Sequence, residues 1–323
     1  MQREKPLLRY LRSTNCPGVS RYSLLAIDHA MEQAGIGSLS NRQSKAIVVV
    51  AKALSKLRLV RNVYRSSTGP VFVSFMGYSE SRIVPISCWN EIIPYCFDCW
   101  PDLYERWMSF FKRHRVRIAL FSARQSARHF AGVLPNMRSV WVPEACDPLE
   151  YCSSKSWLER NIDVLELGRR YDYFHSRIRE PLAEANRVHL FEQVKGKIIF
   201  PDRDGLVDGY ARSKISICFP CSQTHPERSG SIETVTLRYF ESMASKCIIL
   251  GRAPQELIDL FGYNPVIEVR DGHEFEQIES LLNSPDSCHD LVELNYRRLM
   301  EVGTVKSRVE QILDILRKHT GLS

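Results

Sequence analysis

The chain has 323 residues, of which 44% are hydrophobic and 25% are charged, and its formal net charge is +7 at neutral pH. This composition is that of a globular protein, and the length suits two domains that each bury a core of their own. No apolar run reaches the length of a membrane span, the opening residues lack a secretory apolar segment, and ten cysteines are too few for a disulfide framework, so we expect a cytoplasmic protein.

The first 70 residues are strongly basic, with 12 Lys and Arg against 3 Asp and Glu. Apolar spacing predicts helices over 21–35 and 42–59, and the second helix carries an apolar stripe flanked by cations. We expect a helical extension that approaches an acidic surface, either an anionic membrane or a nucleic acid. The stripe comprises Ile47, Val50, Leu54 and Leu57, and the cations are Lys45, Lys52, Lys56 and Arg58.

From residue 71 the pattern changes to alternating strands and helices, which indicates a parallel α/β sheet. The loop from Gly77 to Arg82 follows the first of these strands, where a Rossmann-like domain presents its ligand-binding turn, but it lacks the G-x-G-x-x-G fingerprint. Strands are predicted over 71–75, 83–87, 116–121 and 139–142, and helices begin at Pro101 and span 123–131.

A proline-rich passage from Pro143 to Pro148 ends the first domain, and a polar linker follows it. The alternation then resumes, which predicts a second parallel sheet with covering helices. The predicted strands are 162–168, 197–200, 215–219, 247–250 and 265–269, and the predicted helices are 172–191, 206–211, 233–245, 254–261, 275–282, 287–302 and 305–318.

The most informative stretch runs from Ser229 to Arg252, as a Gly/Ser loop, a helix and a buried strand. A loop that leads into a helix presents unpaired N–H groups and a positive dipole end, so it can bind a phosphate. Glu233 and Glu241 stand eight positions apart on the predicted helix, about 12 Å along its axis, and could address the two ends of one elongated ligand.

This Glu-x7-Glu spacing, followed by Met-Ala-Ser and a strand, resembles the signature of retaining glycosyltransferases of the GT-B class. The resemblance implies that Glu233 contacts the donor sugar and that Glu241 holds the nucleotide ribose. It also implies that Ser231, Thr234 and Val235 bind the donor, with amides after the first glutamate at the diphosphate.

The same resemblance assigns a role to the segment after the first strand of the second domain. A Gly-Arg pair at this point supplies a cation to the diphosphate, here Arg169 or Arg170 after Gly168. The lysine that follows in the family is missing, and Arg177 is the candidate substitute. Asp204, in the segment before the 206–211 helix, falls in the family's base-recognition loop.

The expected fold is therefore α/β and GT-B-like, with two Rossmann-like domains whose parallel sheets face a cleft. We expect the basic extension at 1–70, an acceptor domain at 71–155 and a donor domain at 156–323. The resemblance extends to the bacterial spore-maturation-type branch. It implies hexosyl or deoxyhexosyl transfer, with retention, from a nucleotide-diphosphate sugar to a glycan or lipid-linked acceptor in polysaccharide or glycolipid synthesis.

Other functions stay open at this point. The basic first segment fits a nucleic-acid-binding protein, although we expect no nucleic-acid partner, and a GT-B scaffold that only binds glycans is a third class. Cys96/Cys99 and Cys218/Cys221 could form a zinc site, but they fall in different predicted domains. Helix amides and arginines can neutralise a diphosphate, so we expect no metal and no cofactor beyond the sugar nucleotide.

Overall fold

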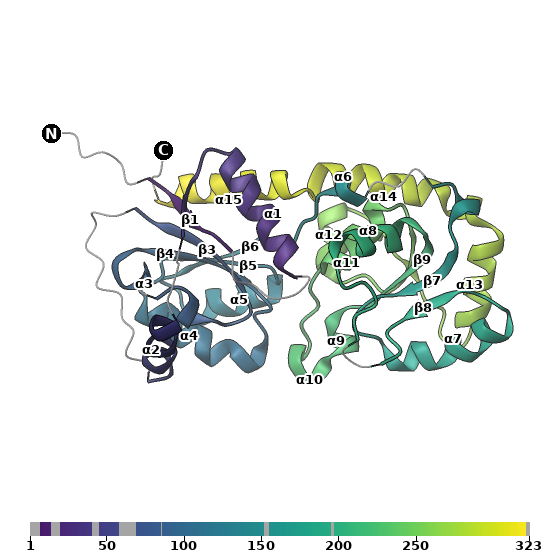
Figure 1. The fold of residues 1–323 in the computed structure, drawn as a ribbon, viewed down its shortest axis with the longest axis horizontal. Coiled ribbons are helices and arrows are strands. Elements are labelled where there is room, and N and C mark those ends of the chain that lie inside the picture. Colours follow the sequence, from purple (N-terminus) through teal and green to yellow (C-terminus); the bar gives the residue numbers. More distant parts are fainter. Residues whose placement is uncertain are drawn as a thin grey trace. The chain divides into compact units, whose positions relative to one another are not determined.

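A computed structural model of the chain describes residues 7–13, 20–40, 45–57, 69–84, 86–151, 155–194 and 197–320. The chain divides into two compact units (Figure 1): Met1–Pro143 with Arg308–Ser323, and Glu144–Ser307. Each unit is built on one sheet whose strand pairs are all parallel. The α/β class and the two parallel sheets predicted from the sequence are therefore confirmed.

The first unit has a six-stranded sheet in the order β2-β1-β3-β4-β5-β6. Its strands are β1 (Arg9–Leu11), β2 (Gly37–Leu39), β3 (Val71–Met76), β4 (Ile92–Phe97), β5 (Ile118–Phe121) and β6 (Arg138–Trp141). Its helices are α1 (Ser20–Gln33), α2 (Lys45–Lys56), α3 (Ile86–Trp89), α4 (Tyr104–Arg113) and α5 (Arg124–Val133), with two 3-10 turns at Glu80–Arg82 and Pro101–Leu103.

Aromatic side chains fill the core of this unit because α4 places apolar residues at helical spacing toward the sheet. Trp107 lies 5.4 Å from Phe75 of β3 and 5.5 Å from Phe111, measured between ring centroids. Phe111 in turn lies 5.9 Å from Phe121 of β5. All four side chains are at most 2% exposed, so they lie at the centre of this core.

Two predictions for the first unit need correction. Residues expected in an accessory extension form β1 and β2, and β1 pairs with β3, so this segment contributes to the sheet. The strand predicted at 83–87 is absent, because Ile83 and Val84 lie in a turn and α3 begins at Ile86. The next strand of the sheet is β4, which was not predicted because it contains Pro94. Proline lacks the backbone N–H that would donate a hydrogen bond to a neighbouring strand.

The second unit has a five-stranded sheet in the order β11-β10-β9-β7-β8. Its strands are β7 (Ile162–Glu166), β8 (His189–Phe191), β9 (Ser213–Cys218), β10 (Ile248–Gly251) and β11 (Ile267–Glu268). Its longer helices are α7 (Asp172–Glu184), α8 (Arg203–Ala211), α11 (Leu237–Ala244), α12 (Gln255–Phe261), α13 (Glu274–Asn283) and α14 (His289–Val302). Short segments are α6 (Pro148–Tyr151), Trp157–Glu159, α9 (Cys221–Thr224), α10 (Pro226–Ser229) and Pro285–Cys288.

Helices cover both faces of this sheet (Figure 1), as parallel strands require. One face packs on α7 and α13 through a continuous apolar core, while α8, α11 and α14 lie on the other face. The first core includes Val164, Ile215, Ile217, Ile248 and Leu250 from the strands.

Three predictions for the second unit need correction. The helix expected over 172–191 ends at Glu184, and its last three residues form β8. No strand forms over 197–200. The helix expected from Glu233 begins only at Leu237, because the backbone of Thr236, the residue before it, is extended. Glu233, which was predicted to lie on this helix, therefore belongs to the preceding loop.

The terminal helix α15 (Val305–Thr320) passes from one unit into the other at Arg308. The predicted division, with 156–323 entirely in the donor domain, thus differs from the observed one, which begins the second unit at Glu144. The side chains of Lys45, Lys52 and Lys56, and the whole of Arg58, fall outside the described residues. Of the helices that are described, none is both long and apolar enough to cross a membrane.

Candidate active site

The topology of the second sheet identifies its ligand-binding edge. Strand β7 has β8 on one side and β9 on the other, so the chain order reverses direction between β7 and β9. In open α/β sheets, ligands bind beyond the carboxyl ends of the strands at such a switch point. The segments that emerge there are Leu167–Tyr171 after β7 and the loop from Phe219 after β9.

An arginine that sequence reasoning missed joins these segments to α11. Arg238, in the first turn of that helix, donates from Nη1 to the carbonyl oxygens of Leu167 at 2.8 Å and Arg169 at 3.2 Å. Between them Gly168 adopts a φ of +72°, a conformation that suits glycine. The only signal for Arg238 in the sequence was that it is the single cation among the residues of α11.

Positive charge gathers around His225 in the loop after β9. Burial, and after it the charge of Arg169, lowers the pKa of His225. The charge of Glu227 opposes this shift, while Arg228 and Arg238 act in the same direction as Arg169. The pKa shift therefore reports three guanidinium groups within electrostatic reach of one imidazole. We call Arg169, Arg228 and Arg238 the arginine cluster. Its chemistry suits an anion such as a diphosphate.

The loop between β9 and α11 also holds polar atoms without partners. Within the described part of the second unit, six buried side-chain N or O atoms make no hydrogen bond, and four of them lie between residues 223 and 236. They are Gln223 Oε1, Thr224 Oγ1, His225 Nδ1 and Thr236 Oγ1. A buried polar atom without a partner costs free energy, so this concentration fits a site that a ligand completes.

Glu233, the first carboxylate of the predicted pair, lies in this loop and is half-buried. Its Oε1 accepts a hydrogen bond from Ser222 Oγ at 3.3 Å, which connects it to α9. Ser231 is exposed nearby in sequence, while Thr234 is only 3% exposed. Glu233 is therefore placed where a carboxylate can meet a ligand bound by the loop.

The Val235 amide has a partner inside the unit. Its N–H donates to Glu256 Oε1 at 2.6 Å, and the side chain is fully buried. A phosphate would have to compete with this carboxylate for the amide, so donor binding by Val235 stays a prediction. In this conformation the arginine cluster is the source of positive charge near the loop.

Glu241, the second carboxylate of the predicted pair, lies in a more buried environment than Glu233. It is 6% exposed and accepts hydrogen bonds from Tyr151 at 2.5 Å and Tyr210 at 3.2 Å. Arg203 Nη1 lies 3.7 Å from the carboxylate. Burial raises the pKa of Glu241, and the bond from Tyr151 and the charge of Arg203 oppose that rise. In this conformation Glu241 belongs to an internal network, and its contact with a ribose stays a prediction.

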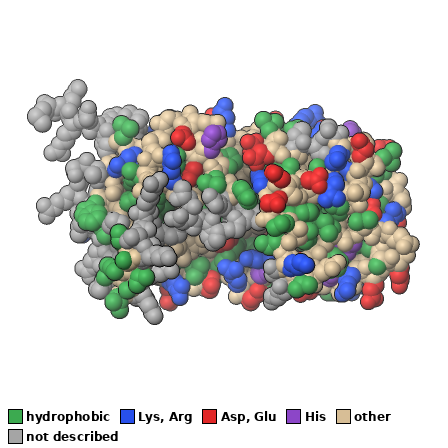
Figure 2. Space-filling model, viewed as in Figure 1, with side chains coloured by type: hydrophobic (Ala, Val, Ile, Leu, Met, Phe, Trp, Pro, Cys, Tyr) green, Lys and Arg blue, Asp and Glu red, His purple; other side chains and the backbone are tan. Residues whose placement is uncertain are grey.

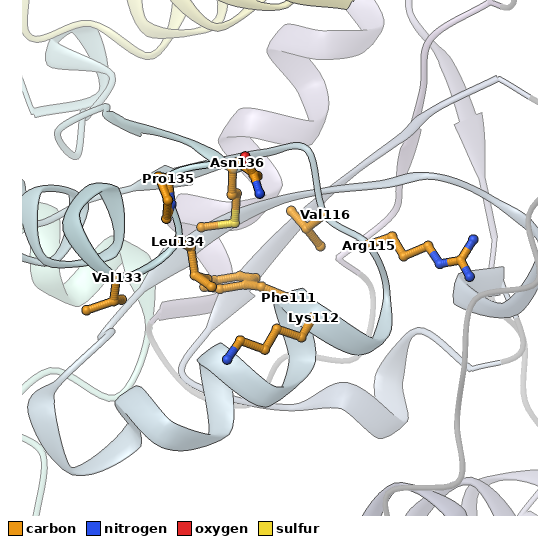
Figure 3. Close-up of a pocket in the computed structure, with 9 residues that line it drawn as sticks. Phe111, Lys112, Arg115, Val116, Val133, Leu134, Pro135 and Asn136 are labelled. Atoms are coloured by element: carbon orange, nitrogen blue, oxygen red, sulfur yellow. The ribbon is translucent and has the colours of Figure 1, made fainter.

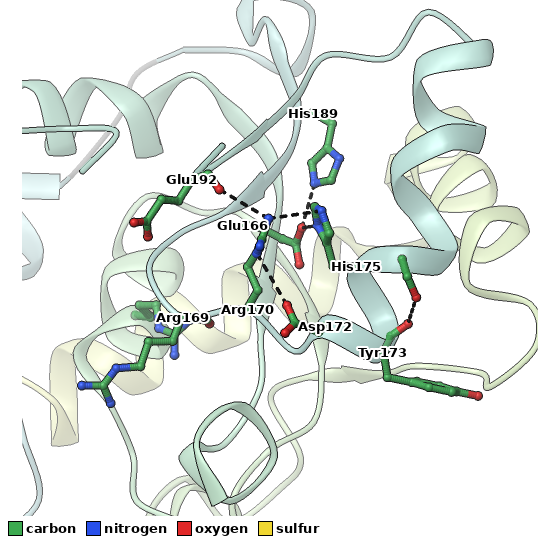
Figure 4. A network of polar contacts seen from close by, with 10 residues as sticks. Glu166, Arg169, Arg170, Asp172, Tyr173, His175, His189 and Glu192 are labelled. Atoms are coloured by element: carbon green, nitrogen blue, oxygen red, sulfur yellow. Dashed lines mark hydrogen bonds and ion pairs between the residues drawn. The ribbon is translucent and has the colours of Figure 1, made fainter. Parts of the chain in front are cut away.

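The two adjacent arginines after β7 point in different directions (Figure 4). Arg170 Nη1 lies 3.3 Å from His175 Nε2 and 3.3 Å from the carbonyl oxygen of Glu192, whereas Arg169 is exposed. Both arginines line the small hollow that also contains Arg238, but Arg169 is the more exposed, and Arg170 already contacts His175 and the Glu192 carbonyl. Contact of either one with a diphosphate stays a prediction.

Among the described residues, the observed surroundings of Arg177 and Asp204 do not include the arginine cluster. Arg177 pairs with Glu274 at 3.6 Å and stacks on the Tyr173 ring at 4.6 Å. Asp204 is exposed in the first turn of α8, whose N-terminus is capped by Asp202 through the Gly205 N–H at 2.8 Å. These contacts give Asp202 a structural role, while donor binding by Arg177 and Asp204 stays a prediction.

Glu166, His175 and His189 form a buried polar network next to Arg170 (Figure 4). Glu166 Oε2 lies 2.5 Å from His175 Nδ1 and 2.9 Å from His189 Nε2. Burial acts to raise the pKa of Glu166, but the hydrogen bonds from both histidines outweigh it and lower the pKa. Since Arg170 can only donate, His175 Nε2 accepts from it, which places the proton of His175 on Nδ1.

These three side chains are of the types that bind zinc, and their ligand atoms lie within 4.8 Å of one another. A metal would need the Nδ1 lone pair of His175, whereas that nitrogen donates to Glu166. It would also stand close to the positive charge of Arg170. The observed geometry is therefore that of a hydrogen-bond network.

The cysteine pairs are buried in separate units, Cys96/Cys99 in the first and Cys218/Cys221 in the second. Burial raises the pKa of all four thiols, which keeps them protonated and unsuited to zinc. They act as small apolar side chains in their cores.

The loop after β3 in the first unit is also engaged. Glu80, at 2% exposure, pairs with Arg113 at 2.6 Å and His114 at 2.8 Å, and it accepts a bond from Tyr78 at 3.0 Å. Burial, with the charge of Glu80, raises the pKa of Tyr78 to about 12. The expected ligand-binding turn thus holds a structural carboxylate.

A cavity of about 390 Å³ in the first unit lies at the amino ends of the strands, opposite the carboxyl edge of the sheet (Figure 3). It is bounded by residues that precede β5 and β6 and by the ends of α4 and α5, including Lys112, Val116, Leu134 and Met137. Ligands of such sheets bind at the carboxyl edge, so this cavity is not part of the candidate site.

Neither a family model nor a curated protein matches the sequence. The fold does match solved structures. Anabaena HepE in complex with UDP-glucose aligns with a TM-score of 0.58 at 10% identity, over 97% of this chain and 100% of that one. An alpha-glucosyltransferase in complex with UDP aligns with a TM-score of 0.59 at 10% identity, over 96% and 99%. An alpha-glucosyltransferase in complex with UDP and a 13-mer DNA aligns with a TM-score of 0.58 at 10% identity, over 96% of this chain and 99% of that one.

At this identity the likeness concerns the fold. It extends over nearly the whole chain and over both α/β units. The protein therefore has the GT-B-like architecture that the sequence predicted.

Proposed function

We propose that the protein transfers a sugar from a nucleotide-diphosphate sugar to an acceptor hydroxyl. The arginine cluster at the switch point of the second sheet carries this proposal. It combines fixed positive charge, an ordered helix start and a loop with four unpartnered polar atoms in one place. A diphosphate with an attached sugar would satisfy both the charge and the loop.

The chemistry follows from where charge develops in glycosyl transfer. As the bond from sugar to diphosphate breaks, negative charge grows on the leaving phosphates, and preorganised cations stabilise it. Arg169 would contact the leaving diphosphate, and Arg238 would hold the Arg169 segment in place. Glu233 would orient hydroxyl groups of the sugar. Retention of configuration and hexosyl or deoxyhexosyl transfer come from the resemblance to the GT-B class.

The nucleotide to test first is UDP, because Anabaena HepE and the alpha-glucosyltransferase were solved with UDP or UDP-glucose. Their fold supports a donor site in the second unit. The resemblance places base recognition near Asp204 without selecting a base, so GDP and ADP belong in the same experiment.

For the acceptor we propose a glycan or lipid-linked hydroxyl, reached from an anionic membrane surface in bacterial polysaccharide or glycolipid synthesis. Helix α2 supports this, because its apolar side is exposed rather than packed. Ile47, Val50, Leu54 and Leu57 are 45%, 56%, 36% and 65% exposed. An exposed apolar stripe in a basic segment is typical of helices that lie on membranes.

A nucleic acid is the competing acceptor, since one structural neighbour was solved with DNA. On the face of the second unit shown in Figure 2, basic and acidic side chains are interspersed, which does not favour a phosphate backbone. DNA therefore serves as the comparison ligand in the test below.

Thermal-shift measurements with UDP, GDP, ADP, UDP-glucose and a DNA duplex test the proposal directly. We expect one nucleotide diphosphate to raise the unfolding temperature, and we expect DNA not to do so. Arg169→Ala should abolish the shift, while Arg212→Ala, which removes an arginine paired with Asp208 on α8, should keep it. Release of the nucleotide from its sugar would then separate an enzyme from a glycan-binding scaffold. Stabilisation by DNA alone would overturn the proposal.

A further inference from the structure

A second cavity opens at the carboxyl edge of the second sheet, beside the arginine cluster. It has a volume of about 310 Å³, at the lower end of the range typical for small-molecule sites, roughly 300–1,000 Å³. It lies on the face that α7 and α13 cover, whereas Glu241 belongs to α11 on the other face. The walls of this cavity come from the ends of β7, β9, β10 and β11.

One wall of the cavity is aromatic. Tyr171 lies 4.9 Å from Phe219, Phe219 lies 5.1 Å from Phe174, and Tyr171 lies 5.8 Å from Tyr173, between ring centroids. Tyr173 is 46% exposed, and the Arg177 guanidinium lies 4.6 Å from its ring centroid, so only the part of the ring that Arg177 leaves open is available to a ligand. Rings in mutual contact form a firm surface on which a flat apolar face can stack.

The polar groups of the cavity include both acceptors and one cation: Arg252 lines it, and Glu274 is paired with Arg177 at 3.6 Å. Gln223 Oε1 is buried and, within the described residues, has no hydrogen-bond partner. Glu274 is 4% exposed and accepts from the Gly272 N–H at 3.1 Å, and Asp271 pairs with Arg252 at 3.1 Å. A carboxylate has about four acceptor positions, so both acids can accept further bonds.

The cavity is joined to the candidate donor site by shared residues. Tyr171 and Phe219 line it and also line the small hollow that contains Arg169, Arg170 and Arg238. A ligand in the cavity would therefore lie beside a diphosphate held by the arginine cluster.

We propose that this cavity binds a saccharide ring. A saccharide presents a face of C–H groups to the aromatic wall and a rim of hydroxyl donors to Gln223, Asp271 and Glu274. A uracil base would also stack, but its two carbonyl groups would face carboxylates. A phosphate could approach Arg252, but that guanidinium is already paired with Asp271 and Glu268, so the described residues of the cavity offer it no unpaired cation. The inference rests on the proposed function only for the source of the ring, which is the acceptor glycan or the sugar of the donor.

Ligand-observed saturation-transfer NMR with maltose and lactose tests the site, with uridine as the comparison ligand. We expect saturation of at least one disaccharide and none of uridine in the absence of nucleotide. Gln223→Leu should weaken the saccharide about tenfold, because one hydrogen bond is lost. It should leave the unfolding temperature equal or higher, because the variant also removes an unpaired buried acceptor. Tyr173→Ala should weaken binding as well.

Gln255→Leu is the matched control, since Gln255 is an exposed glutamine bonded to Asp259 on α12. It should leave saccharide binding unchanged. The thermal shift with UDP should survive in Gln223→Leu and Tyr173→Ala. Displacement of the disaccharide by UDP-glucose but not by UDP would assign the ring to the donor, and displacement by neither would assign it to the acceptor.

Any of three results would overturn the inference. The first is equal saccharide saturation in wild type and Gln223→Leu. The second is no saccharide saturation in wild type while UDP still raises the unfolding temperature. The third is saturation of uridine with loss of the UDP shift in the cavity variants, which would make the cavity part of a nucleotide site. Saccharide binding without any nucleotide shift would instead support the cavity and contradict the proposed function.

Discussion

Tyr151 donates a hydrogen bond to Glu241 Oε1 across 2.5 Å, and Arg203 bonds to the same phenol oxygen. Tyr151 ends α6, the helix that follows directly after the first unit, while Glu241 lies on α11. The second carboxylate of the Glu-x7-Glu pair thus fastens the start of the second unit to its central helix. Any ribose that reaches Glu241 has to compete with this tyrosine.

The buried charge of Glu241 should give the protein a pH-dependent stability. Its pKa is raised above the ordinary 4.5, so between these two values the folded state binds more protons than the unfolded state. The contribution of Glu241 to stability is therefore highest below pH 4.5 and falls as the pH rises through the raised pKa. Unfolding temperatures measured from pH 4 to pH 8 should show this slope in wild type and not in Glu241→Gln. A slope of opposite sign would contradict the assignment.

Glu241→Ala separates a structural role from ribose binding. It leaves Tyr151, Tyr210 and Arg203 without their buried partner, and we expect it to destabilise the protein by about 3 kcal/mol. Denaturant titration measures this loss, and the affinity for UDP is measured in parallel. Weaker nucleotide binding with unchanged stability would instead support direct contact of Glu241 with the ribose.

Arg169 and Arg170 should behave differently although they are adjacent. Arg169→Ala should weaken a nucleotide diphosphate by roughly 10- to 100-fold, the value of a hydrogen bond to a charged group. Arg169→Lys should restore the affinity only in part, because the forked contact is lost. Arg170→Ala should mainly lower the unfolding temperature, since its side chain contacts His175 and the Glu192 carbonyl. Isothermal titration with UDP checks both, and a reversed order of effects would refute this placement.

Glu233→Gln should mainly lower turnover. An interaction that strengthens in the transition state changes kcat, whereas uniform binding changes KM, so we expect kcat to fall at least about tenfold with little change in KM for the donor. Glu227→Gln is the control, because Glu227 is an exposed carboxylate of the same loop. Wild-type kinetics in Glu233→Gln with a proven donor would remove Glu233 from the site.

Metal removal should have no effect on the protein. His175 uses its Nδ1 proton to bond Glu166, and Arg170 adds positive charge next to that ring. Dialysis against EDTA should therefore leave the unfolding temperature and the turnover unchanged, and elemental analysis should find substoichiometric zinc. Stoichiometric zinc that is lost in His189→Ala would show that the three side chains are ligands.

Anionic vesicles should bind the protein, and neutral vesicles should not. Each basic residue near an anionic leaflet contributes on the order of 1 kcal/mol, and salt screens this attraction. Co-sedimentation should be lost at high salt and in the variant that reverses Lys45, Lys52, Lys56 and Arg58 to glutamate. Absence of binding to anionic vesicles at low salt would leave the basic segment as a contact for the acceptor or a partner.

Several elements followed directly from the sequence because they are marked locally. The strands β3, β7, β9 and β10 are short segments buried along nearly their whole length, and the helix α4 carries a helical period that buries Trp107, Phe110 and Phe111. The alternation of these elements was enough to indicate two parallel sheets. The Gly168-Arg169 segment and the loop before α11 were also visible, since glycine and serine mark the turns at which such sheets bind ligands.

The tertiary structure decided what depends on partners distant in the chain. β1 and β2 are three-residue strands, too short to leave a period, and only pairing with β3 makes them part of the sheet. Likewise, no spacing rule could show that Tyr151 and Arg203 would take Glu241 into the interior, or that Arg238 would clamp the segment containing Arg169. Periodicity reports which face of an element is buried, whereas hydrogen-bond partners are set by contacts between residues tens of positions apart.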